Sequence, residues 1–161
     1  MPRGSTRCTS LRSADRGEGW VVAQFVLLAA VVAGAFFGGS WPWPVRLFGG
    51  VLLFLGLLFG IAAARSLGPA MTALPRPLER GELVVSGPYA VVRHPVYSGV
   101  AAAAAGFSVL FSSWWSLGAS LALAVFFHFK AVREETWLVA RYPGYPDYMS
   151  RVPRRLIPWL T

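Results

Sequence analysis

Charged residues and thiols are scarce in this chain of 161 residues. Only 14% of its residues are charged, whereas 55% are hydrophobic, which is too apolar for an ordinary soluble domain of this size. Cys8 is the single cysteine, so one chain can build neither a disulfide framework nor a cysteine-based zinc site. These shortages exclude a disulfide-stabilised secreted fold and predict an integral membrane protein.

Acidic residues are rarer still than basic ones. Seven Asp and Glu stand against fifteen Lys and Arg, which gives a net charge of +8. Such a balance can indicate a nucleic-acid partner, but here the basic residues lie between apolar runs and form no continuous basic stretch. We therefore expect a membrane lipid surface as the partner, and no nucleic acid.

The chain also lacks a glycine-rich dinucleotide fingerprint. Each major polar segment between the apolar runs has only about 30 residues, too few for the βαβ-built domain of soluble nucleotide-binding enzymes. Any nucleotide-like cofactor would therefore have to bind against the ends of membrane helices.

Long uncharged runs are abundant by contrast. The first, Trp20 to Gly38, is expected to be a retained membrane helix of about 28 Å, and a second run extends from about Leu47 to Ala64. Pro95 to Phe129 contains no Asp, Glu, Lys or Arg. One helix of that length would measure about 52 Å, so the run predicts two short helices that turn near Ser112 to Trp115.

The distribution of positive charge supports four spans. Four spans place both termini and the polar segment 65–94 on one side of the membrane, together with fourteen of the fifteen Lys and Arg; Arg46 alone lies opposite. By the positive-inside rule this side is the cytoplasm. The predicted fold is an all-α integral membrane protein of about four transmembrane helices, with a tail (1–19), two first helices (20–66) and a C-terminal core (67–161).

The first chemical motif is "GPYAVVRHPVYSG" at residues 87–99. Pro95 suits the first position of a helix and biases His94 towards an extended backbone. The positive end of that helix, with Arg93, His94 and Tyr97 beside it, is suited to hold a carboxylate or phosphate. The same residues also suit anchoring at lipid headgroups, and spacing alone leaves both interpretations open.

The second motif is "REETWLVARYPGYPDYMSRVPRRLIP" at residues 133–158. If a helix continues out of the membrane, His128 and Glu135 share one face and Glu134 points about 100° away. Glu135 is therefore the better inward-facing acid, while the two carboxylates beside Lys130 and Arg133 also suit plain surface pairing.

The two motifs together resemble the membrane-embedded isoprenylcysteine carboxyl methyltransferase family, which is related to the phospholipid methyltransferases. Their order, their spacing of about 40 residues and their position after membrane spans agree with that family. The resemblance covers roughly the C-terminal half of the chain and leaves the first two spans unassigned.

The resemblance implies S-adenosylmethionine as cofactor and a lipophilic or lipidated substrate. It also implies a cofactor-binding set composed of Tyr89, Arg93, His94, Pro95, Tyr97, Glu134 and Glu135. As catalytic candidates it leaves Glu134, a base if the acceptor is an amine or phenol, and Arg133 or Arg154, which would position an acidic substrate. No metal is expected.

Carboxyl O-methylation of an isoprenylcysteine-like or other lipid acid is the expected reaction. Alternatives from other classes remain open on the sequence: a phospholipid-type N-methyltransferase, an NADPH-dependent membrane reductase, and a non-catalytic membrane scaffold.

Overall fold

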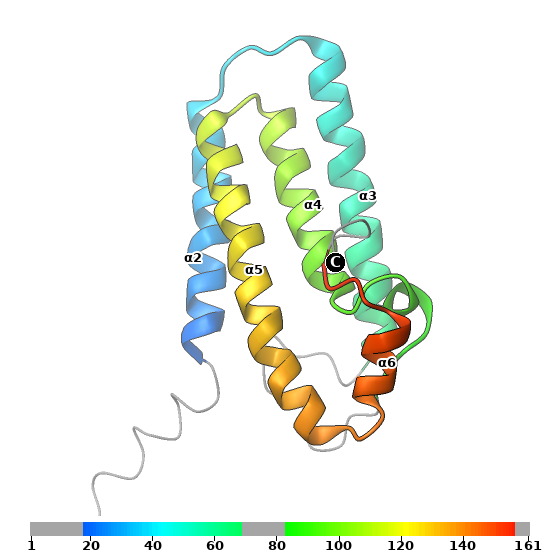
Figure 1. Cartoon of the computed structure of the whole chain (residues 1–161). Coiled ribbons are helices and arrows are strands. Elements are labelled where there is room, and N and C mark those ends of the chain that lie inside the picture. The colour runs from blue at the N-terminus through cyan, green and yellow to red at the C-terminus, as the bar shows by residue number, and fades with distance from the viewer. Residues whose placement is uncertain (1–17, 69–82, 157–161) are drawn as a thin grey trace, which may run out of the picture.

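The computed structural model describes residues 18–68 and 83–156, and this part of the chain is all helical, without strands (Figure 1). The major helices are α2 (Glu18–Gly34), α3 (Trp43–Leu67), α4 (Pro95–Leu110) and α5 (Trp114–Arg141). A short α6 (Tyr145–Arg151) follows, and single 3₁₀ turns form η1 (Ala35–Phe37) and η3 (Gly87–Ala90). The predicted all-α architecture is confirmed.

Among the described residues, three stretches are long and apolar enough to cross a membrane: Gly19–Phe37, Trp43–Leu67 and Trp114–Arg141. The shorter apolar helix Pro95–Leu110 runs alongside them. The hydrophobic side chains of α2 and α3 are largely exposed on the bundle surface, where lipid tails would cover them. The protein is therefore an integral membrane protein.

The helices pack in an order that differs from the sequence. α3 packs along α4, α4 packs on α5, and α5 packs on α2, so the α4–α5 hairpin lies between the first two helices (Figure 1). One end of the bundle carries the α4–α5 turn and the connection from α2 to α3. The other end carries α6 and the start of α4.

Glycines bring α3 and α4 into backbone contact. A Cβ atom added to Gly56 would lie 2.6 Å from the Ala103 amide nitrogen, and one added to Gly106 would lie 2.3 Å from that of Leu53. Small residues permit such close approach in membranes, where helix association depends on van der Waals packing. The spacing of Gly56 and Gly60 therefore reflects packing within the bundle.

Buried serines tie the turn of the hairpin to α2. The Ser113 hydroxyl donates to the Gly34 carbonyl at 2.6 Å, and the Ser116 hydroxyl donates to the Val31 carbonyl at 2.8 Å. Both acceptors lie in the last turns of α2, where some carbonyls have no partner within the helix. Trp114 and Trp115 are exposed beside this turn, as expected of aromatic residues at a membrane interface.

The boundaries of two spans differ from the expectation. The second span is longer than Leu47 to Ala64, because α3 begins at Trp43, with Pro44 in its first turn, and ends at Leu67. The predicted turn near Ser112 is confirmed, and α4 has 16 residues. α5 has 28, because its charged continuation stays helical. Of the polar segment 65–94, residues 69–82 lie outside the described structure.

We predict that Gly106→Ala lowers the midpoint of thermal unfolding in detergent, because its Cβ would collide with the backbone of α3. Overpacking of this kind typically costs about 1–3 kcal/mol. Gly118→Ala is the matched control, since no atom of another described element lies within 4 Å of its added Cβ. The control should leave the midpoint unchanged or raise it, and equal behaviour of the two variants would contradict the close packing.

Candidate active site at the end of the bundle

The start of α4 is built as the first motif predicts. Pro95 is the first residue of α4, and His94 before it has a non-helical backbone with φ −123° and ψ 63°. The turn η3 precedes them and begins at Gly87, whose φ of 62° favours glycine. This local structure turns His94 and Tyr97 towards α5, where both contact its acidic residues.

Glu135 lies at the centre of a buried ion cluster. The Arg93 Nε atom donates to its carboxylate at 2.7 Å, and the Arg155 Nε atom donates at 2.9 Å. His94 Nε2 lies 3.3 Å from the same carboxylate. Two guanidinium groups thus offset the cost of removing this carboxylate from water.

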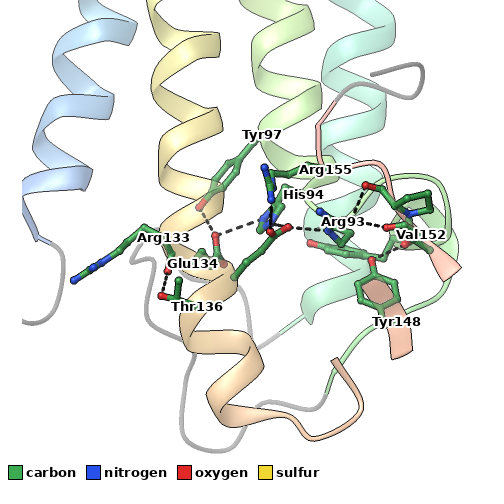
Figure 2. A network of polar contacts seen from close by, with 12 residues as sticks. Arg93, His94, Tyr97, Arg133, Glu134, Thr136, Tyr148, Val152 and Arg155 are labelled. Atoms are coloured by element: carbon green, nitrogen blue, oxygen red, sulfur yellow. Dashed lines mark hydrogen bonds and ion pairs between the residues drawn. The ribbon is translucent and has the colours of Figure 1, made fainter. Parts of the chain in front are cut away.

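Glu134 forms a second, more open contact. The Tyr97 hydroxyl donates to its carboxylate at 2.9 Å, and His94 Nδ1 lies 3.6 Å away (Figure 2). The Tyr97 ring stacks with the His94 ring and with the Phe127 ring, at interplanar angles of 3° and 6°. Glu134 retains 22% side-chain exposure, so it is the carboxylate better placed to meet a ligand.

The segment after α6, residues 152–156, is called the C-terminal strap here, and it closes over the start of α4. Arg93 Nη1 donates to the carbonyls of Val152 and Pro153 at 2.8 and 2.7 Å. The Arg93 and His94 amides donate to the carbonyls of Arg154 and Arg155, both at 3.0 Å. The Ser98 hydroxyl donates to the Leu156 carbonyl. Arg93 therefore holds the strap and Glu135 together.

Two buried tyrosines of α6 lie close to this cluster. The Tyr148 hydroxyl donates to the Tyr89 carbonyl at 2.7 Å, and burial raises the pKa of Tyr148 to about 12, which keeps this donor protonated. Burial, with a smaller effect of the Glu135 charge, also raises the pKa of Tyr145. Among the described residues, no group forms a hydrogen bond with the buried Tyr145 hydroxyl.

Residues 45–144 match the family model described as phospholipid methyltransferase. This protein belongs to the phospholipid methyltransferase family. That family contains the membrane isoprenylcysteine carboxyl methyltransferase-like proteins, so the resemblance read from the two motifs is confirmed. A membrane methyltransferase is the class of enzyme that this membership supports.

A curated relative is the "Cobalt-zinc-cadmium resistance protein CzcN" of Cupriavidus metallidurans, 31% identical over 136 residues. The aligned region covers 83% of this chain but only 59% of the relative, so the chain spans less than two thirds of that protein. Within residues 18–68 and 83–156, no group of three or more His, Cys, Asp and Glu side chains is placed to hold a metal ion.

Most of the residues expected to bind cofactor in this phospholipid methyltransferase family member lie together at one end of the bundle. The side chains of Arg93, His94, Tyr97, Glu134 and Glu135 are connected by the contacts described above. Pro95 begins the helix that carries Tyr97 and directly follows Arg93 and His94, and Tyr89 contributes a backbone carbonyl.

The two arginines expected to position a substrate lie outside this cluster. Arg133 is exposed and its guanidinium lies 5.2 Å from the Trp137 ring centre, pointing away from Glu134 (Figure 2). Arg154 is also exposed, and only its carbonyl takes part. Arg155 contacts Glu135 instead. Neighbouring side chains of an extended segment point to opposite sides, so the double arginine could have suggested that only one faces inward.

Helical periodicity predicted the inward face of α5 only in part. Glu134 and Glu135 both face the site, because the cluster reaches around the flank of α5 as well as its centre. His128 does not share the inward surface of Glu135; it is exposed and packs against Phe129. Lys130 is fully buried, so the interpretation of surface pairing was wrong for this residue. Gln24 of α2, which accepts a hydrogen bond from Lys130, was not among the predicted residues; a lone polar side chain in an apolar run is the signal that marks it.

We predict that Glu135→Gln lowers the unfolding midpoint far more than Glu134→Gln. The first change leaves the buried Arg93 without its anion, and breaking a buried ion pair typically costs about 3–5 kcal/mol. Glu134→Gln keeps an acceptor for the Tyr97 hydroxyl at a partly exposed position, so it should lower the free energy of unfolding by only about 1 kcal/mol. The unfolding midpoints of both variants, measured in the same detergent, test this prediction. A larger decrease for Glu134→Gln would refute the assignment of Glu135 as the structural centre.

Proposed function

We propose that this protein transfers a methyl group from S-adenosylmethionine to the carboxylate of a lipophilic acceptor, such as an isoprenylcysteine-like or other lipid acid. The proposal rests chiefly on one observation. The start of α4 and the charged continuation of α5 meet in one cluster that contains Tyr97–Glu134 and His94–Glu135–Arg155. Family membership supports methyl transfer as the reaction.

The residues present fit such a cofactor. Glu134 and Arg155 are the partly exposed charges of the cluster, with side chains 22% and 28% exposed. A carboxylate and a guanidinium suit the ammonium and carboxylate groups of an amino-acid moiety. The unpartnered Tyr145 hydroxyl is buried in α6, and a buried hydroxyl without a partner costs about 1–3 kcal/mol. A ligand that accepts its hydrogen bond would recover this free energy.

S-adenosylmethionine supplies an electrophilic methyl group on a sulfonium sulfur when it is bound. The task of the protein is to align the acceptor with that group, since in-line geometry contributes much of the acceleration in displacement reactions. A carboxylate acceptor has a pKa of about 4 and is ionised at neutral pH, so it needs no general base. For an amine or phenol acceptor, Glu134 would be the base.

Access to the site follows from its position at the end of the bundle. We propose that the acceptor reaches it from the bilayer and the cofactor from the cytoplasm. The basic residues support this orientation, because Arg65, Arg133, Arg141 and Arg151 belong to the site end, whereas Arg46 donates to the Leu110 carbonyl at the opposite end. Both termini would then be cytoplasmic.

The deciding experiment is transfer of radiolabelled methyl groups into a total lipid and protein extract by the purified protein. We expect label in a lipophilic fraction, released as methanol by mild base because a methyl ester forms. Glu134→Gln and His94→Ala should reduce labelling at least about tenfold. Base-stable label in phospholipid would instead identify N-methylation.

Thermal unfolding in detergent with added ligands distinguishes the proposed methyltransferase from an NADPH-dependent reductase and from a non-catalytic scaffold. S-adenosylmethionine and S-adenosylhomocysteine should each raise the unfolding midpoint, as any ligand of the native state does. Stabilisation by NADPH alone would point to a reductase and overturn the proposal. No response to any of these ligands, together with no labelling, would leave the non-catalytic scaffold.

The two tyrosines of α6 provide a matched pair of variants. We predict that Tyr145→Phe leaves stability unchanged or raises it, since it removes an unpartnered buried hydroxyl, but weakens S-adenosylhomocysteine binding severalfold. Tyr148→Phe removes the bond to the Tyr89 carbonyl and should lower stability by about 1 kcal/mol. Calorimetric titration and thermal unfolding measure the two effects. Unchanged affinity in Tyr145→Phe would exclude the tyrosine from the binding site.

A further inference from the structure

Helix α2 lies outside residues 45–144, which match the family model, yet one of its side chains contacts a residue beside the candidate site. Gln24 is the only polar residue between Trp20 and Gly38, and polar side chains in membrane spans are costly and usually functional. Its Oε1 atom accepts a hydrogen bond at 2.6 Å from Lys130 Nζ of α5. The first helix is thereby connected to the charged part of α5.

Lys130 connects this contact to the site. Its side chain is completely buried, and its Nζ atom lies 5.2 Å from the centre of the Tyr97 ring, within the range of a cation–π interaction. Glu134 follows one turn later on α5, and the charges of the two residues attract one another. Tyr97 in turn donates to Glu134. Lys130 thus contacts one member of the Tyr97–Glu134 pair and attracts the other.

We infer that Lys130 is a positioning residue for the Tyr97–Glu134 pair, and that Gln24 makes α2 a part of the site by fixing the Lys130 ammonium group. A buried lysine is strongly unfavourable unless its charge is compensated. A benefit to the site must therefore offset the cost of burying Lys130. The benefit is that the Tyr97 ring and the Glu134 carboxylate are held in one arrangement before the ligand binds. This preorganisation lowers the entropy cost of binding.

The same helix pair offers an internal comparison. At the far end of the bundle, the Ser116 hydroxyl ties α5 to the Val31 carbonyl of α2 at 2.8 Å. This bond holds α2 in place without contacting Tyr97 or Glu134. A variant at Ser116 therefore loosens α2 while leaving the site intact, which separates a general effect on packing from the specific role of Gln24 and Lys130.

The test combines affinity for S-adenosylhomocysteine with thermal unfolding, for Lys130→Met, Lys130→Arg, Gln24→Leu and the double variant Gln24→Leu/Lys130→Met. Because the inference rests on the proposed function, the wild-type protein must first bind S-adenosylhomocysteine. We expect Lys130→Met to raise the dissociation constant at least about tenfold, Lys130→Arg to restore most of the affinity, and Gln24→Leu to raise it about three- to tenfold. The double variant should bind no worse than Lys130→Met alone, since both substitutions remove one interaction.

Ser116→Ala and His128→Gln are the controls, one for the docking of α2 and one for the exposed face of α5. Ser116→Ala should lower the unfolding midpoint, and both controls should change the affinity less than about twofold. Equal loss of affinity in Ser116→Ala and Gln24→Leu would reduce α2 to a packing role and overturn the inference.

The unfolding data keep the inference separate from the proposed function. If the wild type binds no S-adenosylhomocysteine, the proposed function fails, but the midpoints still report whether Gln24 and Lys130 are coupled. If the effects of the two single substitutions on the free energy of unfolding are strictly additive, the Gln24–Lys130 contact is not formed. That result alone would overturn the positioning role. Coupling between them would support the link from α2 to the buried lysine.

Discussion

The Glu135 carboxylate is the interaction on which the site end of the bundle depends. It accepts from Arg93 at the start of α4 and from Arg155 of the C-terminal strap, and His94 lies beside it. Three segments far apart in the sequence therefore meet at one buried anion. A buried carboxylate is tolerated only when it is paired with cations. The C-terminal strap supplies the second cation, Arg155, and the pairing of Arg155 with Glu135 in turn holds the strap in place.

The division between the two adjacent acids follows from this arrangement. Glu135 is committed to holding the structure together, whereas Glu134 remains partly exposed and accepts one bond from Tyr97. The neighbouring positions thus carry identical side chains in different environments. The Arg93 guanidinium also has two functions, since it pairs with the acid and donates to two strap carbonyls. A planar guanidinium with several donors suits such a junction better than an ammonium group.

Sequence patterns predicted the fold well because bilayer thickness restricts what a long apolar run can do. The position of Pro95 also predicted where α4 begins, since proline at a first helical position has a strictly local cause. The pairing of Arg155 with Glu135 could not be obtained in this way, because it depends on how the strap returns across α4. Lys130 was misjudged for the same reason: its burial is caused by Gln24 and Tyr97 on other helices, and helical periodicity in α5 cannot reveal them.

The order of the helices in space bears on how the chain assembles. α2 and α3 are made first, yet each packs against a helix of the later hairpin, α2 on α5 and α3 on α4. The glycine surfaces of α3 and the terminal carbonyls of α2 therefore obtain their partners only after α4 and α5 have inserted between them. Biogenesis therefore cannot end with neighbouring helices joined in the order in which they emerge, because the final contacts of α2 and α3 form only once the hairpin is present.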